Sequence, residues 1–129
     1  MAYLNLTPTL KTTRSATITT AIGASGNILV YSGTQPSDPS QTAVGTLLVT
    51  LPCSATFGTS TAGVLTANAI TQANAVATGT AGWARIATSG GSGIVDLDVG
   101  TSGTSVIINT TAIVSGGPVQ CTSLTITEQ

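Results

Sequence analysis

The stretch TGTAGWARIATSGGSGIVDLDV, residues 78–99, contains the only tryptophan of the chain and predicts a β-hairpin. Successive side chains of a strand point to opposite faces, so Trp83 and Arg85 share one face of the first limb while Ala84 and Ile86 share the other. The connecting run SGGSG has the composition of a hairpin turn. The first limb is therefore expected to be an amphipathic strand.

The second limb of the hairpin alternates in the same way. Val95, Leu97 and Val99 lie on one side of the strand and Asp96 and Asp98 on the other, a period of two that a helix would not keep on one face. We therefore expect a half-buried antiparallel pair. Its dry face would be covered by the rest of the chain, and its aspartate face would lie in solvent.

Short strands separated by Gly, Ser, Pro and Asn turns fill most of the remaining sequence. They are expected at 27–31, 46–51, 64–70, 106–109, 112–114 and 119–127, with a turn at 58–63. Many short strands of this kind predict an all-β fold, an antiparallel β-sandwich of jelly-roll type. Residues 27–129 would form this single domain, and residues 1–26 an N-terminal arm.

At most one short helix is expected, within the N-terminal arm. Between residues 12 and 24, Ile18 and Ile22 can share one helical face with two alanines, and Gly23 can end the helix. The threonines of the same segment favour a strand instead, because β-branched side chains fit strands better than helices. Both interpretations remain open from the sequence.

Composition limits the possible partners. The chain has 129 residues, only 5% of them charged, a net charge of −1 and no histidine. This balance lacks the basic surface that nucleic acids require, and no apolar run approaches the roughly 20 residues of a bilayer helix, so neither nucleic acid nor membrane is an expected partner. Because a net charge near zero gives little repulsion between copies, self-association as a dimer or trimer is expected.

The two cysteines, Cys53 and Cys121, are far apart in the sequence and have no C-x-x-C spacing. They give no metal or redox signature. The N-terminal residues lack the continuous apolar core of a signal peptide, which predicts synthesis and retention in a cytosol. Two free thiols are thus predicted in preference to a disulfide, since reducing compartments keep thiols reduced.

Few residues could support catalysis, because no histidine can act as a base for a nucleophile. We predict a non-enzymatic protein without cofactors.

Asp96 and Asp98 could bind Ca²⁺, but one D-x-D is a weak signal, and a solvated strand face is the preferred interpretation. Trp83 with Arg85 could form a recognition patch, although a tryptophan that covers the core beneath an arginine is more common.

Four segments carry a resemblance to a known family: NILVYSGTQP at 27–36, GVLTANAI at 63–70, ATGTAGWARI at 77–86 and the tail from Val95 onward. The resemblance extends over nearly the whole chain from Asn27 onward. The sequence resembles a family of small virion structural proteins encoded by tailed bacteriophages and prophages. The resemblance implies a structural role in the virion and no catalytic residue.

The leading expectation is a capsid decoration or cement protein that binds the major capsid protein as a homo-oligomer. A tail, neck or fibre protein is the first alternative, with the exposed loop at 33–44 serving attachment. A small carbohydrate-binding or calcium-dependent adhesion module, resting on Trp83 and the aspartates, is the second.

The N-terminal arm is a further candidate for contact with a partner. Its Tyr3, Leu4 and Leu6 could add a strand to the edge of a partner's sheet, or they could cover the core of this chain.

Overall fold

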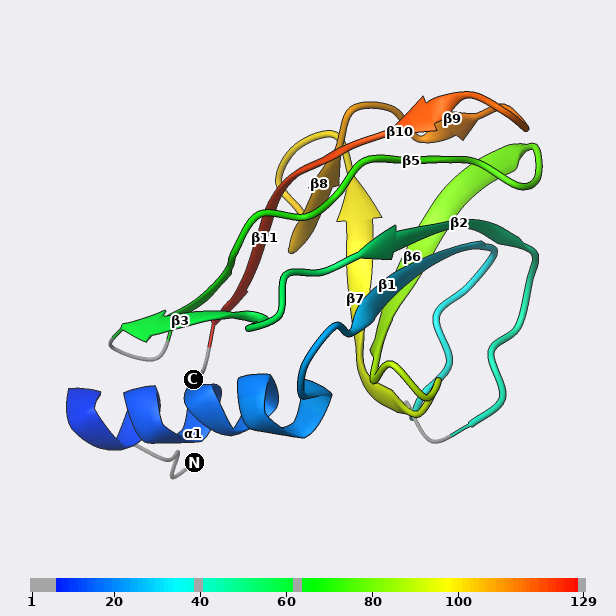
Figure 1. Cartoon of the computed structure of the whole chain (residues 1–129). Coiled ribbons are helices and arrows are strands. Elements are labelled where there is room, and N and C mark those ends of the chain that lie inside the picture. Colours follow the sequence, from blue (N-terminus) through cyan, green and yellow to red (C-terminus); the bar gives the residue numbers. More distant parts are fainter. Residues whose placement is uncertain (1–6, 39–40, 62–63, 128–129) are drawn as a thin grey trace.

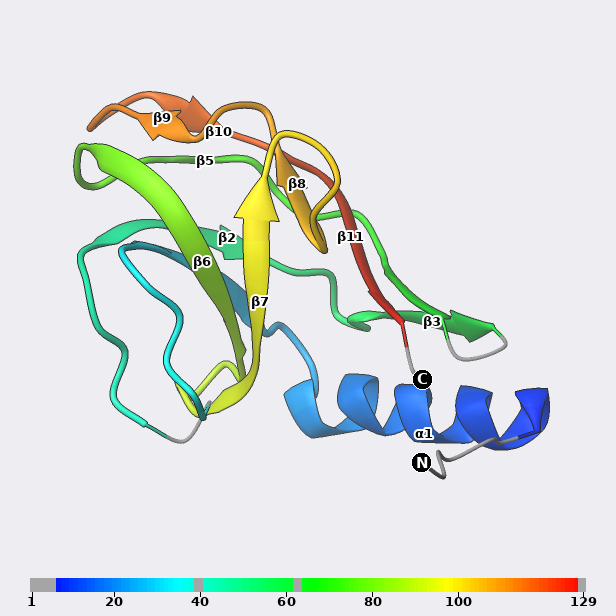
Figure 2. The same cartoon turned by 180° about the vertical axis from the view of Figure 1, so that it is seen from behind.

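The computed structural model describes residues 7–38, 41–61 and 64–127, and its fold is mainly β with one helix (Figures 1 and 2). The elements in chain order are α1 (Pro8–Ile22), β1 (Asn27–Ser32), β2 (Leu47–Pro52), β3 (Gly58–Thr61), β4 (Val64–Ala67), β5 (Ala73–Asn74), β6 (Gly79–Ala87), β7 (Gly93–Gly100), β8 (Val106–Ile108), β9 (Ala112–Ile113), β10 (Pro118–Val119) and β11 (Cys121–Thr127). The described part of the chain contains no helix that is both long and apolar enough to cross a bilayer.

The helix α1 decides between the two interpretations of the N-terminal segment in favour of a helix, which begins earlier than the apolar pattern indicated. The Thr7 hydroxyl caps it by accepting a hydrogen bond from the Leu10 N–H at 3.2 Å, and Pro8 occupies its first turn. Gly23, with φ at 73°, ends it as expected. The threonines are accommodated because several of their hydroxyls, such as Thr12 Oγ1 to Pro8 O at 3.0 Å, hydrogen-bond the preceding turn.

The main sheet has the strand order β2-β1-β6-β7-β8-β11-β4-β3, and β9 pairs with β6 beside this path. The predicted hairpin is present as the antiparallel pair β6–β7, with Arg85 opposite Asp96. One pairing departs from the antiparallel expectation, because β7 and β8 run parallel from Val99 beside Val106. The strands β5 and β10 form a separate two-stranded sheet.

Strand β3 occupies residues where the sequence predicted a turn. Its run Gly58-Thr-Ser-Thr61 pairs with β4 in antiparallel register, so the turn prediction is wrong for these four residues. A Cβ on Gly58 would lie 2.4 Å from the Thr66 carbonyl oxygen, so the close approach of the two strands requires glycine here. As a polar edge strand, β3 shows none of the apolar alternation from which strands are recognised.

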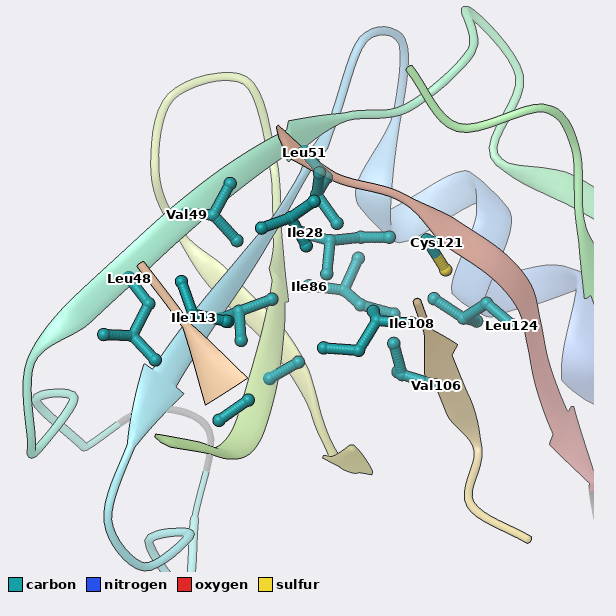
Figure 3. Close-up of a cluster of buried hydrophobic side chains, with 14 of the residues drawn as sticks. Ile28, Leu48, Val49, Leu51, Ile86, Val106, Ile108, Ile113, Cys121 and Leu124 are labelled. Atoms are coloured by element: carbon teal, nitrogen blue, oxygen red, sulfur yellow. The ribbon is translucent and has the colours of Figure 1, made fainter. Parts of the chain in front are cut away.

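The core lies between the two ends of this sheet, which curls so that its strands face each other (Figure 3). Ile28, Leu51 and Ile86 come from β1, β2 and β6, and they meet Val106, Ile108 and Leu124 from β8 and β11. All six side chains are at most 2% exposed. The predicted mainly β, sandwich-like fold is therefore confirmed.

A bulge in β11 explains how Cys121 and Leu124, three positions apart in one strand, both enter the core. The register with β8 shifts between Cys121 and Ser123, and such a shift turns the following side chains to the other face. Cys121 and Leu124 are consequently both buried. In an uninterrupted strand over 119–127, as predicted, these two side chains would lie on opposite faces.

Candidate functional site

A buried ion pair joins the two limbs of the β6–β7 hairpin. Arg85 on β6 donates from Nε to Asp96 Oδ1 at 2.7 Å and from Nη2 to Asp96 Oδ2 at 3.0 Å. The side chains are only 8% and 2% exposed, respectively. This paired geometry is the strongest form of arginine–carboxylate contact, and the hydrogen bond to Asp96 raises the pKa of Arg85, which therefore stays charged.

Two aromatic rings lie beside this ion pair. Tyr31 on β1 is the register partner of Trp83 on β6, and their rings stack with centroids 4.8 Å apart and planes inclined by 14°. The Arg85 guanidinium carbon lies 5.3 Å from the centroid of the Trp83 ring. Trp83 is fully buried, so the tryptophan and arginine form an internal stack, the structural interpretation preferred from the sequence.

The residues of the ion pair also bind the long connection between β1 and β2. We call this connection the 33–45 loop, and its residues 39 and 40 lie outside the described residues. Arg85 Nη1 donates to the Gln41 carbonyl oxygen at 2.6 Å, and Gln35 Nε2 donates to the Asp96 carbonyl oxygen at 3.3 Å. At the base of the loop, the Ser32 N–H donates to Thr46 O at 3.0 Å. The loop is thus fixed to the sheet at its base and near its tip.

Two glycines permit this close approach. A Cβ on Gly82 would lie 2.1 Å from the Gly33 carbonyl oxygen, and one on Gly45 would lie 2.0 Å from Ser32 O. Gly45 also has φ at +88°, a conformation that other residues rarely adopt. These positions allow the base of the 33–45 loop to lie directly on β6.

The expectation that the aspartate face of the hairpin lies in solvent is wrong for Asp96. Its side chain is covered and paired with Arg85, because the 33–45 loop lies over this face of the sheet. Asp98 is exposed, and its Oδ1 accepts a hydrogen bond from the Ser105 N–H at 3.1 Å. Both Asp96 oxygens are bonded to Arg85, and within residues 7–38, 41–61 and 64–127 no group of three or more potential metal ligands occurs.

The other predicted contact residues, Tyr3, Leu4 and Leu6, lie outside the described residues. The structure adds Tyr31, Gln35 and Gln41 to the site, none of which the sequence pattern identified as a site residue. Tyr31 has an aromatic side chain at the end of a predicted strand, which is a weak signal. Gln41 takes part through its backbone carbonyl, which any residue could provide, so its identity carries no signal.

A second exposed surface lies at the end of the molecule opposite α1, where β5, β9 and β10 lie together (Figure 1). Val76 and Val114 are 67% and 62% exposed there, and we call this surface the valine end. The segments that carry them are joined by hydrogen bonds from Ala75 N to Gly117 O and from Ser115 N to Thr78 Oγ1 at 2.8 and 2.9 Å. Residues 73–79 and 112–118 contain no ionisable side chain.

Comparison of the chain with known protein families, with curated proteins and with solved structures found no match. The site must therefore be interpreted from its own geometry.

Proposed function

We propose that this chain is a structural protein of a tailed-bacteriophage virion, a decoration or cement protein that binds the outside of the capsid shell. The observation that carries the proposal is the 33–45 loop, which the buried Arg85–Asp96 pair holds against the sheet. A loop fixed before binding loses little conformational entropy when a partner binds it, which favours stable attachment. Val44 on this loop is 52% exposed and supplies an apolar contact for the shell subunit.

The valine end supports the second part of this proposal, contact between copies. Its two exposed valines lie on segments that carry no charge, so two copies meeting there would experience no repulsion between like charges. Many weak contacts around a shell add through multivalency. We assign the 33–45 loop to the shell subunit and the valine end to a second copy of this chain, in a dimer or trimer.

Attachment at the tail, neck or fibre uses the same loop and remains the second candidate. The adhesion alternative loses the two features on which it depended. Trp83 exposes no ring face on which a sugar could stack, and both carboxylate oxygens of Asp96 bind Arg85. A decoration role and a tail role differ in copy number, which can be measured directly.

Quantitative mass spectrometry of purified particles, from the phage or prophage that encodes the chain, tests the proposal. A simple ratio to the major shell protein, corresponding to hundreds of copies, is expected for decoration. A handful of copies, in multiples of three, six or twelve, would transfer the chain to the tail or neck. Absence from the particle would overturn a virion role altogether.

A binding assay on particles lacking the chain tests the loop itself. Val44→Asp is expected to weaken rebinding about tenfold or more, because it places a charge in an apolar contact. Thr17→Asp adds the same charge on the exposed side of α1 and is expected to bind as the wild type does. Equal binding of all three proteins would exclude the 33–45 loop as the attachment surface.

A further inference from the structure

Two cysteines from distant parts of the chain belong to the same apolar core. Cys53 directly follows β2 and packs against the core cluster, and Cys121 begins β11 and is 8% exposed. Both are free thiols in the structure, as the sequence predicted. In Figure 3, Cys121 lies beside Ile108 and Leu124, within the part of the core where the two ends of the sheet meet.

The neighbours of Cys53 connect it with the surroundings of Cys121. On one side of Cys53, the Pro52 carbonyl oxygen accepts a hydrogen bond from the Thr71 N–H at 2.9 Å. On the other side, Ser54 Oγ donates to the Ala69 carbonyl oxygen at 2.6 Å. Residues 52–54 therefore run beside residues 69–71.

Residues 67–70 and 121–124 line a cavity of about 120 Å³. It opens where β11 leaves β4, since these strands pair only from Thr125 to Thr127 on the β11 side. The Cys121 thiol donates to the carbonyl oxygen of Ser123, a residue of the cavity wall, at 3.4 Å. Cys121 therefore lines this cavity, and Cys53 lies on residues 52–54, which are hydrogen-bonded to Ala69 in the cavity wall and to Thr71 directly after it.

Burial governs the ionisation of both thiols. Burial, and secondarily the nearby Cys121, raise the pKa of the Cys53 thiol to about 11. Burial likewise raises the pKa of Cys121. Since the thiolate is the reactive form, both cysteines stay reduced in a reducing compartment and react slowly outside it.

We propose that Cys53 and Cys121 are a disulfide-forming pair that ties the end of β2 to the start of β11 when the protein meets a low-molecular-weight disulfide. The Cys121 thiolate attacks the small disulfide, forms a mixed disulfide and releases one small thiol. The Cys53 thiolate then attacks the sulfur of Cys121 and releases the second small thiol. In sum, two protein thiols are oxidised to one disulfide, and one small disulfide is reduced to two thiols that take up the two protons.

The oxidation does not depend on the proposed function, but its timing does. For a virion protein, the change from a reducing cytosol to an oxidising medium occurs at cell lysis, after assembly. The bond would then strengthen a fold that had formed without it.

The test incubates the purified native protein with bis(2-hydroxyethyl) disulfide and records the intact mass without reductant. We expect the mass of an internal disulfide, two hydrogens below the reduced protein, and no lasting adduct. Because the bond closes a long loop, the melting temperature should rise by about 10 °C and return after reduction. Cys53→Ser and Cys121→Ser are the matched controls, each with one thiol and no internal bond.

Three outcomes would overturn the proposal. Wild-type protein that keeps one adduct on each cysteine has thiols too far apart to react with each other. Protein that forms an internal bond only in denaturant has no native pair. An unchanged or lower melting temperature after oxidation contradicts the stabilising role. None of these results bears on particle copy number, so the proposed function would stand or fall separately.

Discussion

The two faces of strand β6 are both buried, but by different means. On one face Ala84 and Ile86 enter the apolar core, fully covered by strands from both ends of the curled sheet. On the other face Trp83 stacks on Tyr31 of β1, and Arg85 pairs with Asp96 of β7 and donates to the Gln41 carbonyl oxygen of the 33–45 loop. The first face is held by the hydrophobic effect, which needs no particular partner. The second requires specific atoms at specific positions.

The polar face should therefore be the more sensitive one. Arg85→Ala leaves the Asp96 carboxylate buried without a counter-charge, and the expected loss in the free energy of unfolding is about 4 kcal/mol. Urea denaturation monitored by tryptophan fluorescence measures it, since the ring lies beside the site.

The double variant Arg85→Ala with Asp96→Ala distinguishes two contributions to this loss of stability, the unpaired buried charge and the lost side-chain packing. It removes both charges, so it should be more stable than Arg85→Ala alone by about 1 kcal/mol or more. A double variant that is less stable than the single one would mean that packing of the two side chains, and not their charges, holds the loop.

The sequence allowed the apolar face to be predicted but not the cover of the polar face. Alternation in residues 78–99 indicates which side chains share a face, and the mainly β fold follows from many such runs. Whether Asp96 meets water or Arg85 depends on a loop more than forty residues earlier, which contacts Arg85 through the backbone oxygen of Gln41. A contact to a backbone oxygen cannot be predicted from the pattern of side chains. The bulge in β11 and the polar strand β3 escaped prediction for the same reason, because backbone geometry decides them.

Ile86→Ala is the corresponding variant on the apolar face of β6, and its free energy of unfolding is compared with that of Arg85→Ala. Ile86 is fully buried, and its truncation should lower the free energy of unfolding by about 3 kcal/mol through lost burial and a residual cavity. Hydrogen exchange then distinguishes the two faces. Amides of the 33–45 loop should keep their protection against local opening in Ile86→Ala and lose it in Arg85→Ala. Equal loss in both variants would show that the loop and the core unfold as one unit.

Gly82→Ala tests whether the base of the 33–45 loop must lie close to β6, and it adds only one methyl group. The added methyl group would lie 2.1 Å from the Gly33 carbonyl oxygen, which is backbone and cannot rotate away. We expect a loss of about 2 kcal/mol and a displaced loop base. Gly90→Ala is the control, because the nearest atom to its Cβ is 3.8 Å away. If both variants have the same melting temperature as the wild type, the 33–45 loop does not need to lie directly on β6.

The smallest effect is expected at Cys53, at the edge of the apolar core, and it depends on pH. Burial raises its pKa from 9.0 to about 11, so between these values the folded protein binds a proton that the unfolded chain has released. The contribution to stability is complete below pH 9 and is lost as the pH rises towards 11. The wild-type melting temperature should therefore fall more steeply than that of Cys53→Ser over this interval. The two proteins differ only at residue 53, so the difference reports the Cys53 thiol and its neighbour Cys121. Parallel curves would mean that the folded protein does not keep the Cys53 thiol from ionising.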